Sequence, residues 1–346
     1  MDFFSDYTAV TFAGLDKIFE VSAVAFSFNM PFGNGGLVQV RWYGIIIALG
    51  FTLAALFGGR MAYVRKMNLS KMVDVLIYGT FGGIVGARAY YVIFRWDYYS
   101  ACPEEIFQIW RGGLAIYGGI IGGLAAAYIT CRLEKMSFAR LLDLAGMSLL
   151  IGQGIGRWGN FTNQEAFGTN TTLPWGMTSP KVQAYINNNS AFFEQNGITM
   201  DPDIPVHPTF LYESLWCALG FILLYLIAKK FQKFDGQIFL CYGIWYGTGR
   251  AIIEGFRTDS LYVGDTTIRA SQLLSVLIVA VFAALLALSF ARWKKKGSPA
   301  LVFEPDTHLL KDQKKKLENK MKKSEKNEPE KNEPEKNGET DNGDSN

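Results

Sequence analysis

The sequence predicts an all-α polytopic membrane protein with seven transmembrane helices, an outer N-terminus, a cytoplasmic C-terminus and a small outer-face subdomain. Three observations support this fold class. Hydrophobic residues make up 49% of the 346-residue chain, although the part after about Gly297 contains few of them. The other residues form repeated apolar runs, each long enough to cross a ~30 Å hydrocarbon layer. Finally, lysine and arginine collect in alternate short loops.

Seven apolar runs are expected to span the membrane. They are about Leu37–Phe57, Val73–Phe94, Gly112–Cys131, Leu141–Trp158, Pro208–Ala228, Ile238–Glu254 and Ser271–Phe290. Helices are expected because a helix satisfies its own backbone in lipid, and the runs are too long and uniform for barrel strands. The fourth and sixth runs are the weakest, since each ends in charge and glycine.

The positive residues of the short loops give the orientation. They are Arg60, Arg65, Lys66 and Lys71 after the first run, Arg132, Lys135 and Arg140 after the third, Lys229, Lys230 and Lys233 after the fifth, and Arg292 and Lys294–Lys296 after the seventh. The alternate loops carry fewer positive charges and several acids. Because positive loops stay in the cytoplasm, the C-terminus is expected inside and, with seven spans, the N-terminus outside.

The chain divides into three expected parts. Residues 1–36, which lack the basic start of a signal peptide, suit an outer interfacial segment with a short amphipathic helix. The seven-span domain covers 37–290, with an outer loop or subdomain at 161–206 rich in Asn, Thr and Pro. Residues 291–346 form a cytoplasmic charged tail, expected to be disordered from about Gly297. Apart from an Asn-Glu-Pro-Glu-Lys unit in that tail, no internal repeat is evident.

Composition and motifs exclude several function classes. The net charge of +3 is spread over loops and tail, so no nucleic-acid-binding face is expected. The four cysteines are far apart, and neither metal-ligand spacing nor a GxSxG hydrolase motif occurs. No metal or cofactor is therefore expected. Any chemistry would depend on arginine electrostatics and one modest base.

Polar residues at the ends of the runs are the candidate site, because ionisable groups are costly in a membrane. The ionisable residues in or at the ends of the runs are Arg41, Arg88, Asp143, Arg157, Arg250 and Glu254. In the expected topology Arg88, Arg157, Arg250 and Glu254 lie near outer ends, as do Tyr43, Tyr117 and His207. Only Asp143 lies near the cytoplasmic side. The outer leaflet thus receives polar groups from six helices.

Simpler explanations apply to single residues. An arginine near a helix end can snorkel, a tyrosine can belong to the aromatic belt, and the spaced glycines suit helix packing. Arg250 and Glu254 can pair at i, i+4. Snorkelling does not explain the donor run Arg157-Trp158-Gly159-Asn160, which Asn163, Glu165 and Gly168 follow. Three arginines at one depth favour an anionic phospholipid headgroup, because guanidinium binds phosphate oxygens bidentately.

Six ordered motifs between about Val40 and Ala291 resemble the prolipoprotein diacylglyceryl transferase family. They are Arg41-Trp42-Tyr43-Gly44, Gly86-Ala87-Arg88, Gly112-Gly113-Leu114-Ala115-Ile116-Tyr117-Gly118-Gly119, Gly156-Arg157-Trp158-Gly159-Asn160-Phe161 with Asn163, Glu165 and Gly168, His207-Pro208-Thr209-Phe210-Leu211-Tyr212-Glu213, and Tyr246, Gly249-Arg250, Glu254 and Phe256-Arg257.

The resemblance implies a seven-span enzyme of the bacterial inner membrane with its site toward the outer face. It implies transfer of the diacylglyceryl group of phosphatidylglycerol to the lipobox cysteine thiol of prolipoproteins, which forms a thioether and releases glycerol phosphate. Arg157 matches the signature arginine that binds the lipid phosphate, and Arg250 matches the second arginine that the family needs. Many relatives carry histidine, proposed as the base, where this chain has Tyr117.

The candidate catalytic residues are Arg157, Arg250, Tyr117 and His207. The candidate phosphatidylglycerol-binding residues are Arg157, Arg250, Tyr43, Arg88, Asn160, Glu165, Gly168, Tyr246 and Glu254. Tyr117 and His207 both remain open as the base, and His207 before a proline suits a helix-start or loop-holding role equally. The alternative function is a lipid-binding scaffold or transporter with a phosphate-selective cavity. A transporter usually shows paired repeats and ionisable groups at mid-membrane, whereas here those groups collect at one face.

Overall fold

The computed structural model describes residues 7–29, 37–258 and 269–303. The longer helices are α1 (Trp42–Val64), α2 (Leu69–Phe94), α4 (Ile116–Leu133), α5 (Phe138–Asn163), α8 (Thr209–Lys230), α9 (Gln237–Glu254) and α10 (Ala270–Lys295). Short helices are α3 (Trp96–Tyr99), α6 (Pro180–Asn188) and α7 (Ser190–Gln195), and the strands are β1 (Tyr7–Phe12), β2 (Leu15–Ser22), β3 (Val24–Asn29), β4 (Leu37–Arg41) and β5 (Met177–Thr178).

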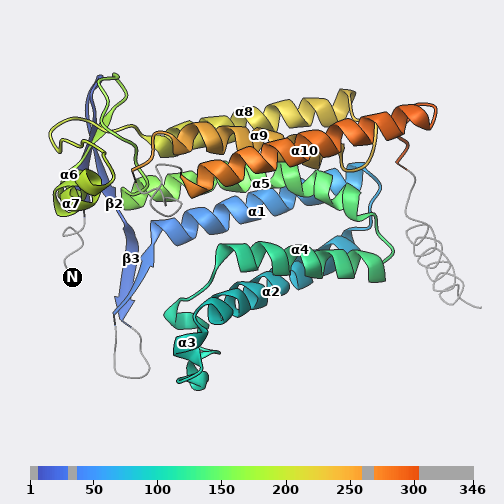
Figure 1. Ribbon diagram of the computed structural model, residues 1–346, viewed down its shortest axis with the longest axis horizontal. Helices are drawn as coiled ribbons and strands as arrows, with labels where there is room; N and C mark the ends of the chain where they lie inside the picture. The colour runs from blue at the N-terminus through green and yellow to red at the C-terminus, as the bar shows by residue number, and fades with distance from the viewer. Residues whose placement is uncertain (1–6, 30–36, 259–268, 304–346) are drawn as a thin grey trace, which may run out of the picture.

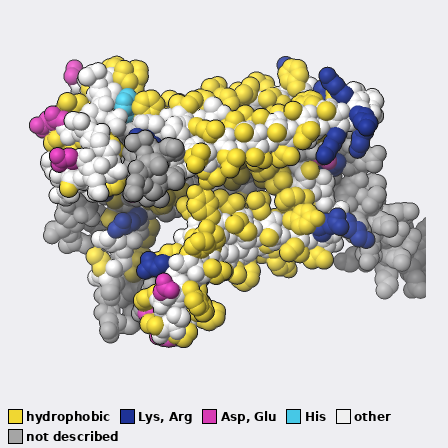
Figure 2. Space-filling model, viewed as in Figure 1, with side chains coloured by type: hydrophobic (Ala, Val, Ile, Leu, Met, Phe, Trp, Pro, Cys, Tyr) yellow, Lys and Arg dark blue, Asp and Glu magenta, His cyan; other side chains and the backbone are white. Residues whose placement is uncertain are grey.

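Six of the described helices are long and apolar enough to cross a membrane: α1, α2, α4, α5, α8 and α10. Their large aliphatic and aromatic side chains face outward, and Figure 2 shows such side chains covering the middle of the helix assembly. An outward apolar surface of this extent suits hydrocarbon rather than water. The polytopic membrane fold is therefore confirmed. The first span begins later than expected, because residues 37–41 form the strand β4 and the helix starts at Trp42.

Helix α9 differs from the other long helices in its surroundings. It packs against α5, α8 and α10, and eight of its eighteen residues are buried. A helix that neighbouring helices shield from lipid can carry polar residues, which explains its lower hydropathy. In Figure 1 it lies between α8 and α10.

Two close helix pairs, α1 with α5 and α2 with α4, form through glycines. A Cβ on Gly86 would lie within contact distance of the carbonyl oxygen of Gly118, and one on Gly50 would lie 3.3 Å from that of Gly152. Small residues let the backbones of membrane helices approach in this way. The packing explanation of the spaced glycines is confirmed for these pairs.

The N-terminal segment is β structure, so the short amphipathic helix suggested for it is wrong across residues 7–29. Strand β1 pairs with β2 and with β5 of the 161–206 loop, while β3 pairs with β4. Residues 7–12, Tyr-Thr-Ala-Val-Thr-Phe, are mostly β-branched and aromatic, which favours a strand. The two segments share a core that includes Val10, Met177 and Val206. They form one small subdomain at one end of the helices (Figure 1).

At the opposite end, the chain after α10 folds back onto the helix turns. The indole of Trp293 donates to the carbonyl of Pro299 over 2.9 Å. The guanidinium groups of Arg65 and Arg140 lie 5.3 and 5.4 Å from the ring centre of Phe303. Residues 299 and 303 thus contact the helix ends, whereas the tail predicted to be disordered lies, from residue 304 on, outside the described residues.

Candidate functional site

The carboxylate of Glu213 is the centre of a charge cluster beside the subdomain. It lies on the first turns of α8 and is 6% exposed. Its Oε2 is 2.5 Å from Nη2 of Arg157 on α5. Its Oε1 is 3.4 Å from Nη1 of both Arg250 on α9 and Arg257 just after α9. Helix α5, helix α9 and the segment after α9 thus each bring one guanidinium group to the carboxylate on α8.

A second carboxylate, Glu254, completes this cluster. Its Oε2 is 2.6 Å from Nη2 of Arg250 and 4.0 Å from Nε of Arg257, and the residue is 1% exposed. The predicted i, i+4 pair between Arg250 and Glu254 is confirmed. Arg269, before α10, donates to the carbonyl oxygen of Glu254. The last turn of α9 is therefore fixed to the start of α10.

The end of α5 extends the cluster through side-chain amides. Nη1 of Arg157 donates to Oδ1 of Asn160 over 3.4 Å, and Nδ2 of Asn160 donates to Oε1 of Glu165 over 3.0 Å. The helix ends because Gln164 adopts a left-handed conformation with φ of 54°, which turns Glu165 back toward the helix. Nδ2 of Asn163 also donates to Glu165, over 3.3 Å. The donor run that snorkelling did not explain is thus a hydrogen-bonded chain.

Gly168 lies where three segments meet. A Cβ there would lie 2.7 Å from Cβ of His207 and 2.9 Å from the carbonyl oxygen of Phe256. Its N–H donates to the carbonyl of His207 over 2.9 Å, and it forms a bridge with Arg257. A side chain at this position would push apart the segment that carries Arg257. The requirement for glycine is therefore steric.

His207 lies in the subdomain, and its contacts favour the loop-holding role. Its Nδ1 is 3.0 Å from the hydroxyl of Tyr212, which accepts a hydrogen bond from the indole of Trp175 over 2.8 Å. Its ring packs against Phe256 at a centroid distance of 5.0 Å. Partial burial lowers the pKa of His207 below its usual value, because a desolvated imidazole disfavours the charged form. The side chain is therefore neutral near neutral pH.

Two tyrosines flank the arginine cluster. The ring of Tyr43 covers Gly159, where a Cβ would lie 2.7 Å from Cδ2 of the tyrosine. Tyr246 lies one helical turn before Arg250 and stacks on Tyr242 at 5.8 Å. Tyr43 and Tyr246 thus come from α1 and α9 to the same group of helices as Arg157.

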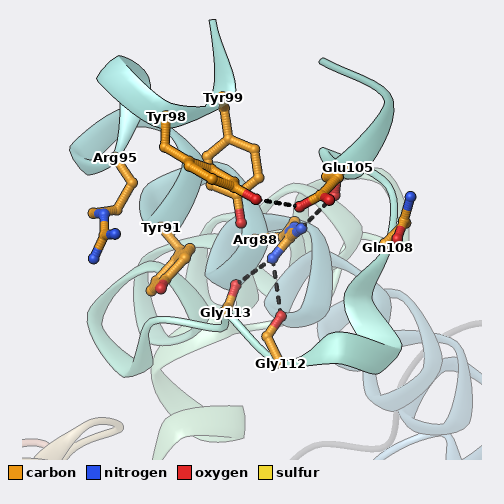
Figure 3. Close-up of a pocket in the computed structure, with 9 residues that line it drawn as sticks. All are labelled: Arg88, Tyr91, Arg95, Tyr98, Tyr99, Glu105, Gln108, Gly112 and Gly113. Atoms are coloured by element: carbon orange, nitrogen blue, oxygen red, sulfur yellow. Dashed lines mark hydrogen bonds between the residues drawn. The ribbon is translucent and has the colours of Figure 1, made fainter. Parts of the chain in front are cut away.

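Arg88 and Tyr117 lie on the other helix pair, α2 and α4. The guanidinium of Arg88 donates to four backbone carbonyls of the loop before α4, that of Ile106 and those of Glu105, Gly112 and Gly113. Figure 3 shows the last three. A cavity of about 220 Å³ lies beside it. Tyr117, on the first turn of α4, is 54% exposed. The structure therefore does not bring these two predicted residues into the Glu213 cluster.

The sequence reasoning missed Glu213 and Arg257 as site residues, although both occur in the quoted motifs. A signal for Glu213 was present, since it is the one acid within the apolar run 208–228. The rule that singled out Arg157 and Arg250 applies to it equally. Arg257 had a weaker signal, because it lies three residues beyond the end of its run. Only the fold brings it to Glu213.

The cluster is suited to binding an anion. Arg157, Arg250 and Arg257 outnumber Glu213 and Glu254, and the side chains of Arg157 and Arg250 are 24% and 20% exposed. Guanidinium forks that bind carboxylates bidentately fit phosphate oxygens as well. The carboxylates hold the forks in place before any anion arrives.

Comparisons with known proteins show the family to which the chain is similar. The family described as prolipoprotein diacylglyceryl transferase matches residues 32–288. The phosphatidylglycerol–prolipoprotein diacylglyceryl transferase of Finegoldia magna is 43% identical over 242 residues, which are 70% of this chain and 88% of that protein. The enzymes of the same name from Listeria innocua and Lysinibacillus sphaericus are 46% and 43% identical, over 70% and 78% of this chain and 83% and 93% of theirs.

Proposed function

Because this chain belongs to the prolipoprotein diacylglyceryl transferase family, we propose that it is a transferase that moves the diacylglyceryl group of phosphatidylglycerol to prolipoproteins, the first step of lipoprotein maturation. The acceptor in this proposal is the lipobox cysteine thiol of the signal peptide. The product is a thioether, and glycerol phosphate leaves. No cofactor takes part in this reaction.

The arrangement of Arg157, Arg250 and Arg257 around Glu213 carries the proposal. In the reaction a thiolate attacks the primary glyceryl carbon that is bonded to phosphate. The carbon–sulfur bond forms as the carbon–oxygen bond breaks, and the electron pair stays with glycerol phosphate. Arginines that bind this phosphate stabilise the charge that develops on the leaving oxygen, most strongly in a water-poor site.

The thiol needs little help to ionise. A cysteine with pKa ~8.5 is a few per cent thiolate at neutral pH, and nearby arginines lower its pKa further. The base is therefore less critical than the phosphate site. His207, neutral near neutral pH, and Tyr117 are the candidates for this role. Tyr43, Asn160, Glu165, Gly168, Tyr246 and Glu254 shape the site around the arginines.

The proposed topology has seven spans in the bacterial inner membrane, with α9 as the sixth and the site toward the outer face. Figure 2 supports this orientation, because lysine and arginine gather at the end where α10 finishes and acids at the opposite end. Positive ends stay in the cytoplasm. The N-terminus and the small subdomain are then outside, and the tail is inside.

The decisive experiment is incubation of the purified chain with phosphatidylglycerol and a lipobox peptide. The proposal requires release of glycerol phosphate together with a peptide heavier by one diacylglyceryl group, and a peptide with serine in place of cysteine must give neither. A scaffold or transporter would bind the lipid and release nothing, which would contradict the transferase function.

A further inference from the structure

The two hairpins α1–α2 and α4–α5 are copies of one unit, which corrects the expectation that the membrane domain has no internal repeat. Helix α2 runs from residue 69 to residue 94, and helix α5 from residue 138 to residue 163, so each bound of α5 lies 69 residues after that of α2. The same offset takes the end of α1, Val64, to the end of α4, Leu133. The sequence match is modest and is strongest in the turns, where Lys66-Met67-Asn68 corresponds to Lys135-Met136-Ser137.

The turns of the two copies share one geometry. Lys66 and Lys135 have φ of 56° and 54°. The N–H of Met67 donates to the carbonyl of Ala62 over 2.9 Å, and that of Met136 donates to the carbonyl of Cys131 over 2.8 Å. The side chains of Asn68 and Ser137 then cap α2 and α5. Left-handed lysines are uncommon, so their shared position supports a repeat.

Packing between the helices also obeys the repeat. Helix α1 corresponds to α4 and helix α5 corresponds to α2, so the contact between α1 and α5 corresponds to the contact between α4 and α2. At the first crossing a Cβ on Gly50 would lie 3.3 Å from the carbonyl oxygen of Gly152. The corresponding residues are Gly119 and Gly83, and a Cβ on Gly119 would lie 3.6 Å from the carbonyl oxygen of Gly83. The same residue contact occurs at both crossings.

In this repeat the counterpart of the site arginine Arg157 is Arg88, at the same place on α2. From this correspondence, and on the premise of the proposed transferase function, we propose that Arg88 is a positioning residue for the transfer. It fixes the loop Glu105–Gly113 and thereby the start of α4, which carries Tyr117. The sequence had suggested that Arg88 binds phosphatidylglycerol; in this proposal it does not bind the lipid phosphate.

The hydrogen bonds of Arg88 support this role. Nε donates to the carbonyl of Ile106 over 2.7 Å and Nη2 to that of Glu105 over 2.6 Å. Nη1 donates to the carbonyls of Gly112 and Gly113, each over 2.9 Å. Four of the five guanidinium N–H donors are therefore used by backbone oxygens, and no fork remains for a phosphate. The residue is 8% exposed.

The loop is built to meet this guanidinium (Figure 3). Gly112 and Gly113 have φ of 89° and 74°, a region that favours glycine. A Cβ on Gly113 would lie 2.5 Å from Nη1 of Arg88. Two residues later, the N–H of Ala115 donates to the carbonyl of Ala87 over 3.0 Å, and Ala115 is the N-cap of α4. The position of Tyr117 thus depends on Arg88.

The test uses the full chain in phosphatidylglycerol vesicles, with Arg88→Ala, the partial replacement Arg88→Lys, and Arg95→Ala as control. The exposed side chain of Arg95 lines the same cavity and makes no hydrogen bond or ion pair with the described parts of the chain. For Arg88→Ala we expect kcat to fall, on the order of ten-fold to a hundred-fold. The KM for phosphatidylglycerol should stay within about two-fold, and Arg88→Lys should lie in between. Arg95→Ala should match the unmodified chain.

A second measurement follows the loop directly. Hydrogen exchange of the Ala115 amide should accelerate in both Arg88 variants and not in Arg95→Ala. Because Arg88 acts through the start of α4, the loss of kcat in the double variant Arg88→Ala/Tyr117→Phe should be smaller than the product of the two single losses. We expect the difference to be about two-fold or more. If Arg88→Ala raises KM while kcat and Ala115 exchange stay unchanged, Arg88 binds the headgroup and the proposal is wrong. Full multiplicativity would also overturn it.

Failure of the transferase function would look different. An unmodified chain that releases no glycerol phosphate would contradict the proposed reaction for all variants alike. Ala115 exchange would still report whether Arg88 fixes the loop. If Arg88→Ala does not accumulate, the kinetic and exchange measurements on Arg88→Lys decide the question.

Discussion

At the scale of single residues, the two site arginines differ from a snorkelling arginine in sharing one carboxylate partner. Arg157 and Arg250 meet at Glu213 from different helices. A snorkelling arginine needs only the interface, whereas these side chains are held in a fixed relation to each other. Such preorganisation matters for catalysis because donors already aligned with a developing charge need no rearrangement during the reaction.

Replacing either arginine should therefore remove transfer. For Arg157→Ala and Arg250→Ala we expect kcat to fall by about 10²–10³-fold or more, while the protein still inserts and accumulates. Arg157→Lys should also be poor, since a point charge lacks the fork. Glycerol phosphate release is the measurement, and Arg132→Ala, at the opposite end of the helices, is the control. Near-normal turnover in both alanine variants would rule out their assignment.

Glu213 is expected to be as important as the arginines that it joins. Glu213→Gln removes the carboxylate charge that the three guanidinium groups share. Breaking a buried ion pair lowers the free energy of unfolding by about 3–5 kcal/mol. We expect loss of transfer together with a clearly lower Tm in detergent. The exposed Asp97→Asn variant should change neither. A Glu213→Gln variant with normal Tm and turnover would mean that the arginines are held by other contacts.

The base is tested by pH. Burial lowers the pKa of His207 below the reference value of ~6.5. A histidine base would therefore be deprotonated, and active, at pH values above this lowered pKa. If His207 is the base, kcat falls as the pH drops through that point, and His207→Gln loses this acidic limb. Tyr117→Phe should slow transfer only moderately, because a reference pKa of ~10 suits a base poorly. Unchanged profiles in both variants would mean that the substrate thiol sets the pH dependence.

At the scale of elements, the repeat changes how the alternative function is judged. Paired repeats are a property of many transporters, and their apparent absence had counted against a carrier. The two copies here run in the same direction, each a hairpin with its turn at the positive end. The copies differ in the contacts of the arginine at the end opposite the turn: Arg157 binds side chains of α5 and α8, and Arg88 binds a loop. The site therefore occupies one copy only.

The segment after α10 gives a prediction at the same scale. Truncation after Phe303 should leave Tm and transfer unchanged. Truncation after Gly297 should lower Tm, because it removes two contacts of arginine with Phe303, each worth about 0.5–1 kcal/mol. Transfer should continue, since the segment lies at the other end of the helices from Glu213. Equal Tm values for both truncations would show that Phe303 contributes nothing.

At the scale of the whole molecule, the orientation is open to a labelling test. In a cysteine-free background that still transfers, Asn188→Cys on α6 should react with a membrane-impermeant thiol reagent in intact cells. Lys230→Cys, at the end of α8, should react only after permeabilisation. Both residues are exposed, so access depends on the membrane alone. The reverse pattern would place the Glu213 cluster on the cytoplasmic side.

The length and uniform apolar character of its runs alone indicated that this chain crosses a membrane, and loop charge indicated the polar ends of its helices. These are local properties, because each helix must satisfy its own backbone hydrogen bonds in lipid, and its own side chains determine whether it is stable there. Arg157 and Arg250 were also recognisable from the sequence, because they stand out within apolar runs. An amphipathic helix was expected for the N-terminal segment, whereas its strands pair with neighbouring strands, and β1 also pairs with β5, far along the chain.

Tertiary structure decided which polar residues act together. Arg88 and Arg157 have the same sequence signal, an arginine near the predicted outer end of a glycine-rich run, yet one holds a loop and the other joins a charge cluster. Their partners, the carbonyls of Glu105–Gly113 and the carboxylate of Glu213, come from segments that only packing brings near. The role of a guanidinium follows from the acceptors around it, and those depend on the fold as a whole.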